Sequence, residues 1–142
     1  MKFVDKDTIV IDDIFPMYFK LNILRKEYAK LSLKENIRLT NLHIGGWGNG
    51  YVGLPFWHPW YKLGYDDIPV DVHGGLTFSN LDEETDLWII GFDTNHGGDN
   101  MENRSFMWIE EETHRLQSQC LKPKKVQRII KLNKLKNYSK KD

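Results

Sequence analysis

Six consecutive residues, Leu87 to Phe92, are apolar on both faces of a strand and are followed at once by Asp93. An apolar run of this length without alternation is typical of a strand buried in the middle of a sheet. Another strand is predicted at Leu76–Ser79, and the acidic stretch Asn80–Asp86 between the two predicts a hairpin. With a further strand predicted at Ile68–His73, the centre of the chain is expected to form a small, largely antiparallel sheet.

Apolar residues at helical spacing flank this region on both sides. The first stripe predicts a helix from Pro16 to about Leu31, and its members are Tyr18, Leu21, Leu24, Tyr28 and Leu31. The second stripe predicts a helix that ends before Pro123, and its members are Phe106, Ile109, Thr113, Leu116 and Cys120. The sum is an α+β fold in which N- and C-terminal helices pack on the sheet.

Shorter segments complete the expected organisation. We predict a strand at Thr8–Ile11, a helical or extended piece at Ile37–Ile44, a glycine-rich loop at Gly45–Gly50 and a strand at Tyr51–Leu54. The stretch Pro55–Tyr61 is expected to be an aromatic loop, because its two prolines exclude a regular helix. Residues 1–123 are predicted to be one α+β domain, and residues 124–142 a basic helix with a flexible tail.

The composition points to a small protein of a reducing compartment. The chain has 142 residues, 20 basic and 20 acidic side chains, and the single cysteine Cys120, which excludes an internal disulfide framework. We expect neither a signal peptide, since Met1–Asp13 has four aspartates and no long apolar core, nor a membrane span, since no run approaches the ~18 apolar residues that one needs. We therefore expect a cytoplasmic protein without a membrane partner. The basic C-terminus is interpreted as a solvated helix, and nucleic acid is not expected as a partner.

Two clusters of acid and imidazole end in glycine pairs. Asp71 and His73 precede Gly74 and Gly75, and two-residue spacing on a strand places both side chains on one face. Glycine pairs allow a ligand to approach the backbone.

The second cluster follows the buried strand, with Asp93, His96 and Asp99 before and around Gly97-Gly98. A carboxylate beside an imidazole orients the ring for acid–base work, so an enzyme would use His73, His96, Asp71 and Asp93. Asp93 and Asp99 have a structural interpretation as well, as side chains that cap turns. No known metal-ligand spacing is present, so no metal is predicted, and no cofactor is assigned.

A binding site without turnover is the other interpretation. Exposed backbone amides of glycine turns hold anions, imidazoles donate to phosphate, and tryptophans stack on bases. The residues predicted to bind a ligand are His58, Trp57, Trp60, Asp71, His73, Gly74, Gly75, Thr77, Asp93, His96 and Asp99.

Several segments, in order and at similar spacing, resemble a family of small proteins encoded by bacteriophages and prophages. The segments are Gly50–Pro55, His58–Tyr61, Tyr65–Asp67, Val70–Phe78 and Gly91–Asp99, followed by a helix that includes Glu112, Leu116 and Gln119. The chain differs from that family in its long basic C-terminus and in Trp47-Gly48-Asn49. The resemblance implies a phage setting, in which small proteins sequester or cleave nucleotide immune signals of the host.

Three functions therefore stand as hypotheses. The first is binding and sequestration of a nucleotide-like small molecule in the host cytoplasm. The second is a hydrolase, metal-assisted or not, that cleaves a phosphodiester or glycosidic bond. The third is a module that binds a host protein through the basic tail and exposed aromatic residues. Each hypothesis is compatible with a homo-oligomer.

Overall fold

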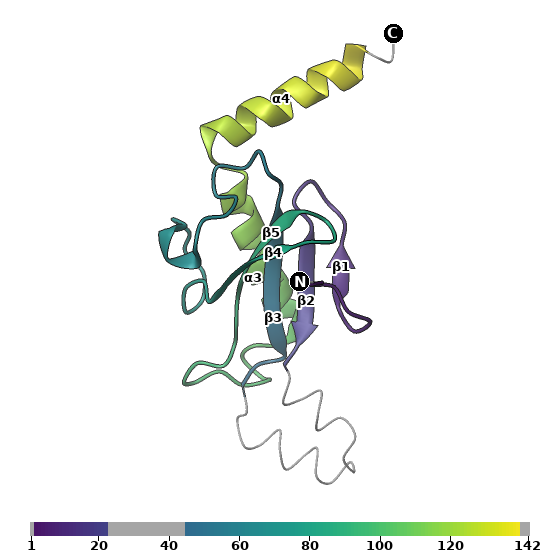
Figure 1. Ribbon diagram of the computed structural model, residues 1–142. Coiled ribbons are helices and arrows are strands. Elements are labelled where there is room, and N and C mark those ends of the chain that lie inside the picture. The colour runs from purple at the N-terminus through teal and green to yellow at the C-terminus, as the bar shows by residue number, and fades with distance from the viewer. Residues whose placement is uncertain (1, 23–44, 140–142) are drawn as a thin grey trace.

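The computed structural model describes residues 2–22 and 45–139, with side chains as far as residue 134. In these ranges the strands form one antiparallel sheet in the order β1-β2-β3-β5-β4 (Figure 1). The elements are β1 (Ile9–Ile11), β2 (Met17–Leu21), β3 (Gly48–Leu54), a 3-10 turn (Tyr65–Asp67), β4 (Phe78–Asp82), β5 (Leu87–Phe92), α3 (Phe106–Cys120) and α4 (Lys124–Ser139). The predicted α+β class is confirmed, as are the strand Leu87–Phe92, its acidic hairpin and the helix that ends before Pro123.

Both faces of the sheet are covered, and strand alternation divides the core between them. Helix α3 packs across β2 and β3 on one face, where Phe19, Val52 and Phe92 meet Ile109 and Leu116 of the helix. On the other face a smaller cluster is built from Phe3, Tyr18, Tyr51 and Ile89. Strand β5 is therefore apolar on both faces, as predicted.

The predicted helix from Pro16 is wrong over its first part. Met17–Leu21 is strand β2, which pairs with β3 so that Met17 lies opposite Val52. Because both faces of β2 are covered, Met17 to Phe19 are buried without a break, and such a run fits a helical stripe as well as a strand. The rest of that helix and the predicted piece at Ile37–Ile44 lie outside the described residues.

The predicted glycine-rich loop is also partly wrong, because Gly48 to Gly50 belong to β3. A Cβ at position 50 would lie 2.0 Å from the Thr113 hydroxyl of α3 and 2.9 Å from the Phe92 ring. Glycine here is a condition for close packing of α3 on the sheet rather than a signal for a turn.

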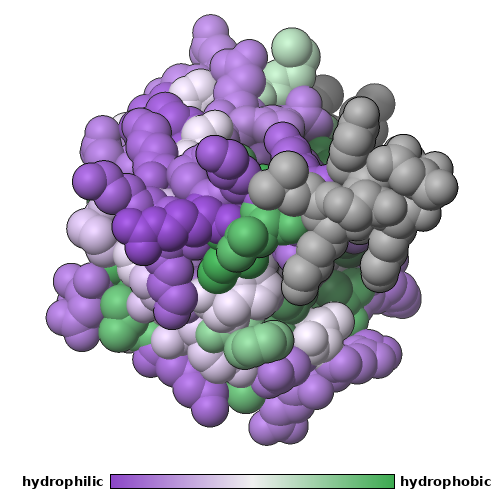
Figure 2. Space-filling model, turned by 90° about the horizontal axis from the view of Figure 1, so that it is seen from above, coloured by the Kyte–Doolittle hydropathy of each residue, from purple (hydrophilic) through white to green (hydrophobic). Residues whose placement is uncertain are grey.

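Helix α4 begins directly after Pro123 and projects from the upper end of the body (Figure 1). Its first turns are tied to the core, since Val126 is fully buried and Ile130 packs against the same cluster. Seen from above, this end of the molecule is mostly hydrophilic, with smaller hydrophobic patches (Figure 2). Among the described residues, neither helix combines the length and apolar character that crossing a membrane requires.

Candidate functional site

The segment that carries Asp71 and His73 is not a strand, contrary to the prediction for Ile68–His73. It runs extended without a strand partner and turns at His73-Gly74, and the next strand, β4, begins at Phe78 rather than at Leu76. Asp71 and His73 therefore do not share a sheet face. The Asp71 side chain is 90% exposed, whereas that of His73 is 19% exposed.

Side chains of α3 form hydrogen bonds to the backbone of the Asp71–His73 segment, as a neighbouring strand would do in a sheet. The Asp71 backbone N–H donates to Gln119 Oε1 at 2.7 Å, and Gln119 Nε2 donates to the Asp71 carbonyl at 2.8 Å. About two helix turns before Gln119, Glu112 Oε2 accepts a hydrogen bond from the His73 backbone N–H at 2.7 Å. These bonds satisfy backbone groups that lack a strand partner and fix His73 over the helix.

Arg115 completes this contact between the helix and the segment. Its guanidinium forms two hydrogen bonds to the Glu112 carboxylate, at 2.7 and 3.0 Å, and a longer one of 3.3 Å to Asp71. Burial would raise the pKa of Glu112, but the bonds from Arg115 and from the His73 amide outweigh it and hold that pKa below its ordinary value. Glu112 is therefore an anion built into the site.

A buried carboxylate orients the His73 ring. His73 Nε2 lies 2.9 and 3.1 Å from the two oxygens of Asp99, whose side chain is only 1% exposed. Asp99 also accepts from Arg104 Nε at 3.0 Å and from the His96 backbone N–H at 3.0 Å. Burial alone would raise the pKa of Asp99, but these donors outweigh it and the pKa lies below its ordinary value.

The two clusters predicted from the sequence meet here. The rings of His73 and His96 lie edge to face, with centroids 5.4 Å apart. His96 Nε2 is 3.0 Å from Asp93 Oδ1, an ion-pair distance, although the two atoms do not meet hydrogen-bond geometry. Asp93 also caps the turn by accepting from the Asn95 backbone N–H, which agrees with the structural interpretation of this residue.

Gly74 explains why the first cluster needs glycine. Its φ is +69°, and a Cβ at this position would lie 2.2 Å from His96 Nε2. Gly75, Gly97 and Gly98, in contrast, have open space where a Cβ would be. The backbone of both turns is thus accessible beside the two imidazoles.

Trp108 and Arg104 belong to this site and were missed by the sequence analysis. The rings of His73 and Trp108 are nearly perpendicular, with centroids 5.1 Å apart, and the Arg104 guanidinium lies 4.3 Å from the centre of the Trp108 ring. A signal was present, because the site residues Trp108, Glu112, Arg115 and Gln119 each precede one member of the apolar α3 stripe. They form a second stripe about 100° around the helix.

Four predicted ligand residues lie elsewhere. His58 contacts the Cys120 carbonyl through Nε2 at 2.8 Å, and Cys120 is twelve residues beyond Trp108 on α3, roughly 18 Å along the axis. The other three are Trp57 and Trp60, which pack against Phe15 and His58 at that end, and Thr77, which leads into β4 and donates its backbone N–H to Gly91.

His58 has a structural role. Its Nδ1 accepts from the Trp60 backbone N–H at 3.0 Å, so Nε2 must carry the proton that it donates to Cys120. Burial lowers the pKa of His58, which favours this neutral tautomer. The histidine joins the aromatic loop to the C-terminal end of α3.

The described residues contain no group of three or more His, Cys, Asp or Glu side chains arranged to hold a metal ion. At this place they form a cluster of two imidazoles, two guanidinium groups and four carboxylates: His73, His96, Arg104, Arg115, Asp71, Asp93, Asp99 and Glu112. The fold and site together define an α+β protein with a buried His–Asp–Arg cluster at one end of its sheet. Comparison of the chain with protein-family models, curated proteins and solved structures found no match.

Proposed function

We propose that this protein binds an anionic, nucleotide-like small molecule at the junction of the His73–Gly75 turn and the Asp93–Asp99 loop. The observation that carries the proposal is the meeting of His73 and His96 from two separate clusters, each with one ring nitrogen beside a carboxylate. Within the described residues, Nδ1 of neither ring has a hydrogen-bond partner. Asp99 orients the His73 ring, which keeps Nδ1 for a ligand, and the His96 ring lies beside it.

The surroundings support an anionic ligand. Imidazolium and guanidinium groups donate charge-assisted hydrogen bonds to phosphate oxygens. Gly74 and Gly98 have positive φ, and backbone amides in such glycine turns can bind anions. Trp108 replaces Trp57 and Trp60 as the aromatic residue beside a ligand, with one face covered by Arg104.

The phage resemblance suggests the ligand class. A signalling nucleotide of the host would combine phosphate groups for the imidazoles with a ribose that the half-buried Asp93 carboxylate could bind. In this proposal the protein sequesters the nucleotide without cleaving it, so that denaturing the protein recovers the nucleotide intact.

The test measures thermal stability with adenosine monophosphate, a cyclic mononucleotide, cyclic dinucleotides and inorganic phosphate as probes. A ligand at 100 times its Kd stabilises the folded state by about 2.7 kcal/mol, so we expect at least one nucleotide to raise Tm by about 5 °C or more. His73→Ala and His96→Ala should each abolish the shift in Tm. His114→Ala, which changes an exposed histidine of α3, should keep it. The proposal fails if no nucleotide shifts Tm, or if both site variants keep the shift.

A second function is favoured by the His73–Asp99 pair, in which a buried carboxylate supports an imidazole as it does beside a general base. His73 Nδ1 would take the proton of an attacking water, the hydroxide would form the new P–O bond, and the leaving oxygen would take the proton back as its own P–O bond breaks. Recovery of the bound nucleotide after acid denaturation distinguishes the two functions. Intact nucleotide supports sequestration, whereas cleaved product that Asp99→Asn forms at least about 10²-fold more slowly supports hydrolysis.

A further inference from the structure

The chain separates its charges sharply. Residues 122–142 contain nine Lys or Arg and one acid, while residues 1–121 contain eleven Lys or Arg and nineteen acids, so a part of net charge +8 follows a part of net charge −8. The overall neutrality of the protein conceals this division. Helix α4 carries most of the positive part and stands away from the sheet (Figure 1).

Where side chains are described, the cations of α4 have no ion-pair partner. In the part of α4 whose side chains are described, the cations are all exposed and none forms an ion pair: they are Lys124, Lys125, Arg128, Lys131 and Lys134. The whole helix, Lys124–Ser139, has no acidic residue. Like charges three or four positions apart, as in Arg128 and Lys131, repel and destabilise an isolated helix, so an anionic partner would relieve a built-in repulsion.

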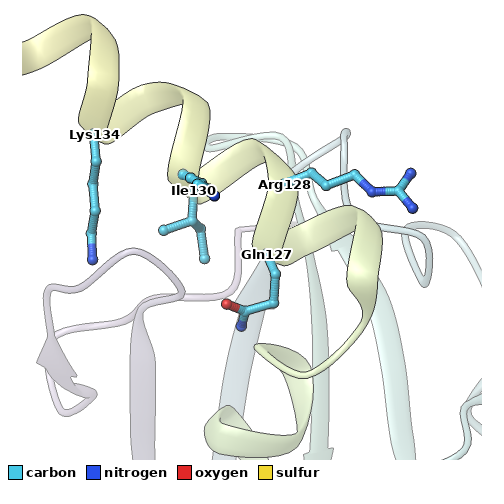
Figure 3. A pocket seen from close by; sticks show the side chains of 5 residues that line it. Gln127, Arg128, Ile130 and Lys134 are labelled. Atoms are coloured by element: carbon cyan, nitrogen blue, oxygen red, sulfur yellow. The ribbon is translucent and has the colours of Figure 1, made fainter.

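A hollow of about 360 Å³ lies beside this helix. Its lining is cationic and apolar without an acid: Gln127, Arg128, Ile130, Lys131 and Lys134. Gln127, Ile130 and Lys134 extend from one side of α4 toward the body, and Arg128 extends from the other side (Figure 3). A volume of this size holds one nucleotide of a strand but not a duplex.

We propose that α4 and this hollow bind the sugar–phosphate backbone of a single-stranded nucleic acid. Lys131, Lys134 and Arg128 would pair with successive phosphates, and Ile130 would contact the apolar face of a sugar or base. A lipid surface fits less well, because Val126 is buried in the core and Leu132 is isolated among cations. A second α4 fits less well in the hollow because its lining is cationic.

The experiment is fluorescence anisotropy with labelled twelve-nucleotide thymidine and uridine strands at 50, 100 and 200 mM salt. The full chain should bind with an affinity that falls with salt, by a slope of about −0.7 per phosphate neutralised. The triple variant Arg128→Gln/Lys131→Gln/Lys134→Gln should bind at least 30-fold more weakly. The slope of its log affinity against log salt concentration should be less negative by about 2. The matched control Lys2→Gln/Lys6→Gln/Lys62→Gln, which removes the same charge from exposed positions of the body, should stay within threefold of the parent.

Equal losses in the two triple variants would overturn the proposal, as would absence of binding at 100 mM salt. A salt-sensitive dimer in sedimentation without oligonucleotide would overturn it in favour of a second copy. Preferential binding to phosphatidylserine vesicles would overturn it in favour of a lipid surface. His73→Ala should leave oligonucleotide binding unchanged, so this proposal and the nucleotide site at His73 succeed or fail separately.

Discussion

At the scale of single residues, the Asp99 carboxylate accepts hydrogen bonds from three segments of the chain, through the His73 ring, the His96 amide and the Arg104 guanidinium. Replacing a buried carboxylate that accepts several hydrogen bonds lowers stability, because its donors stay buried without an acceptor. The same carboxylate determines which nitrogen of His73 faces the solvent side.

Asp99→Asn should lower the free energy of unfolding by about 2 kcal/mol. The new side-chain NH₂ group would face N–H donors that now donate to the Asp99 carboxylate. Urea unfolding gives this value. Asp93→Asn, at a side chain 30% exposed, should cost less than about 1 kcal/mol. Equal effects of the two substitutions would contradict the role of Asp99 as the buried centre of the cluster.

Acid should weaken the fold through Asp99 and Glu112. The pKa of each lies below its ordinary value, 3.8 and 4.5 respectively, so their stabilising effect is complete above those values and is lost as pH falls through the lower folded pKa. Unfolding free energy, measured in urea from pH 6 to pH 2.5, should decline below about pH 4.5. The decline should be shallower in Glu112→Gln, and an unchanged slope would remove Glu112 from this explanation.

Gly74→Ala should displace His96, because the new Cβ would meet Nε2 at 2.2 Å and φ is +69°. We expect a loss of about 2 kcal/mol in unfolding free energy and a changed chemical shift of the His96 ring protons in NMR spectra. Gly64→Ala is the control, since its φ of −63° is ordinary and nothing lies within 4 Å of the added carbon. It should be neutral or slightly stabilising.

At the scale of elements, α3 serves two purposes with two stripes. One stripe packs Ile109 and Leu116 on the sheet, and the adjacent stripe uses Glu112 and Gln119 to hold the backbone of Asp71 and His73. The helix thus replaces a strand as the partner of that segment. This explains why a polar segment without strand pairing can present an ordered histidine.

Gln119→Ala should release the Asp71 backbone, whose N–H donates to Gln119 Oε1. We expect the Asp71 amide to exchange its hydrogen at least about tenfold faster, while the β5 amides keep their protection. Ser118→Ala, an exposed neighbour on the same helix, should leave both unchanged. Unaltered exchange at Asp71 in Gln119→Ala would show that the segment is held by other contacts.

At the scale of the whole molecule, the two imidazoles of the site lie near the start of α3, and the basic helix follows its end. His73 contacts Trp108 near the start of the helix, whereas α4 begins just beyond its end. The molecule therefore offers two separate charged regions, one mixed and partly buried, the other cationic and exposed. The connection between α4 and the body depends on the apolar residues of its first turns.

Val126→Ala should lower the free energy of unfolding by about 2 kcal/mol, because the fully buried side chain loses two methyl groups. Leu132→Ala, at a residue 57% exposed, should change it by less than about 0.5 kcal/mol. Thermal or urea unfolding gives both values. If Val126→Ala is also neutral, α4 contributes nothing to the core.

Sequence reasoning was sufficient where local pattern and tertiary environment agree. Leu87–Phe92, the acidic turn after β4 and the α3 stripe are short-range features, and each formed as expected. The convergence of the His73 and His96 clusters was also proposed from the sequence, since both end in glycines that permit close backbone approach. Helical spacing misassigned Met17–Leu21 because a strand buried on both faces has no alternation to reveal it.

The sequence by itself determined the α+β class, the central strand, the helix before Pro123 and the two glycine-bounded clusters, because these depend on spacing within a few residues. Only the tertiary structure decided which polar groups become partners. Asp99 rather than Asp71 supports His73, Trp108 rather than Trp57 or Trp60 lies beside it, and His58 holds a loop. Such pairings join residues tens of positions apart, and their energy depends on burial and on distances that no local pattern contains.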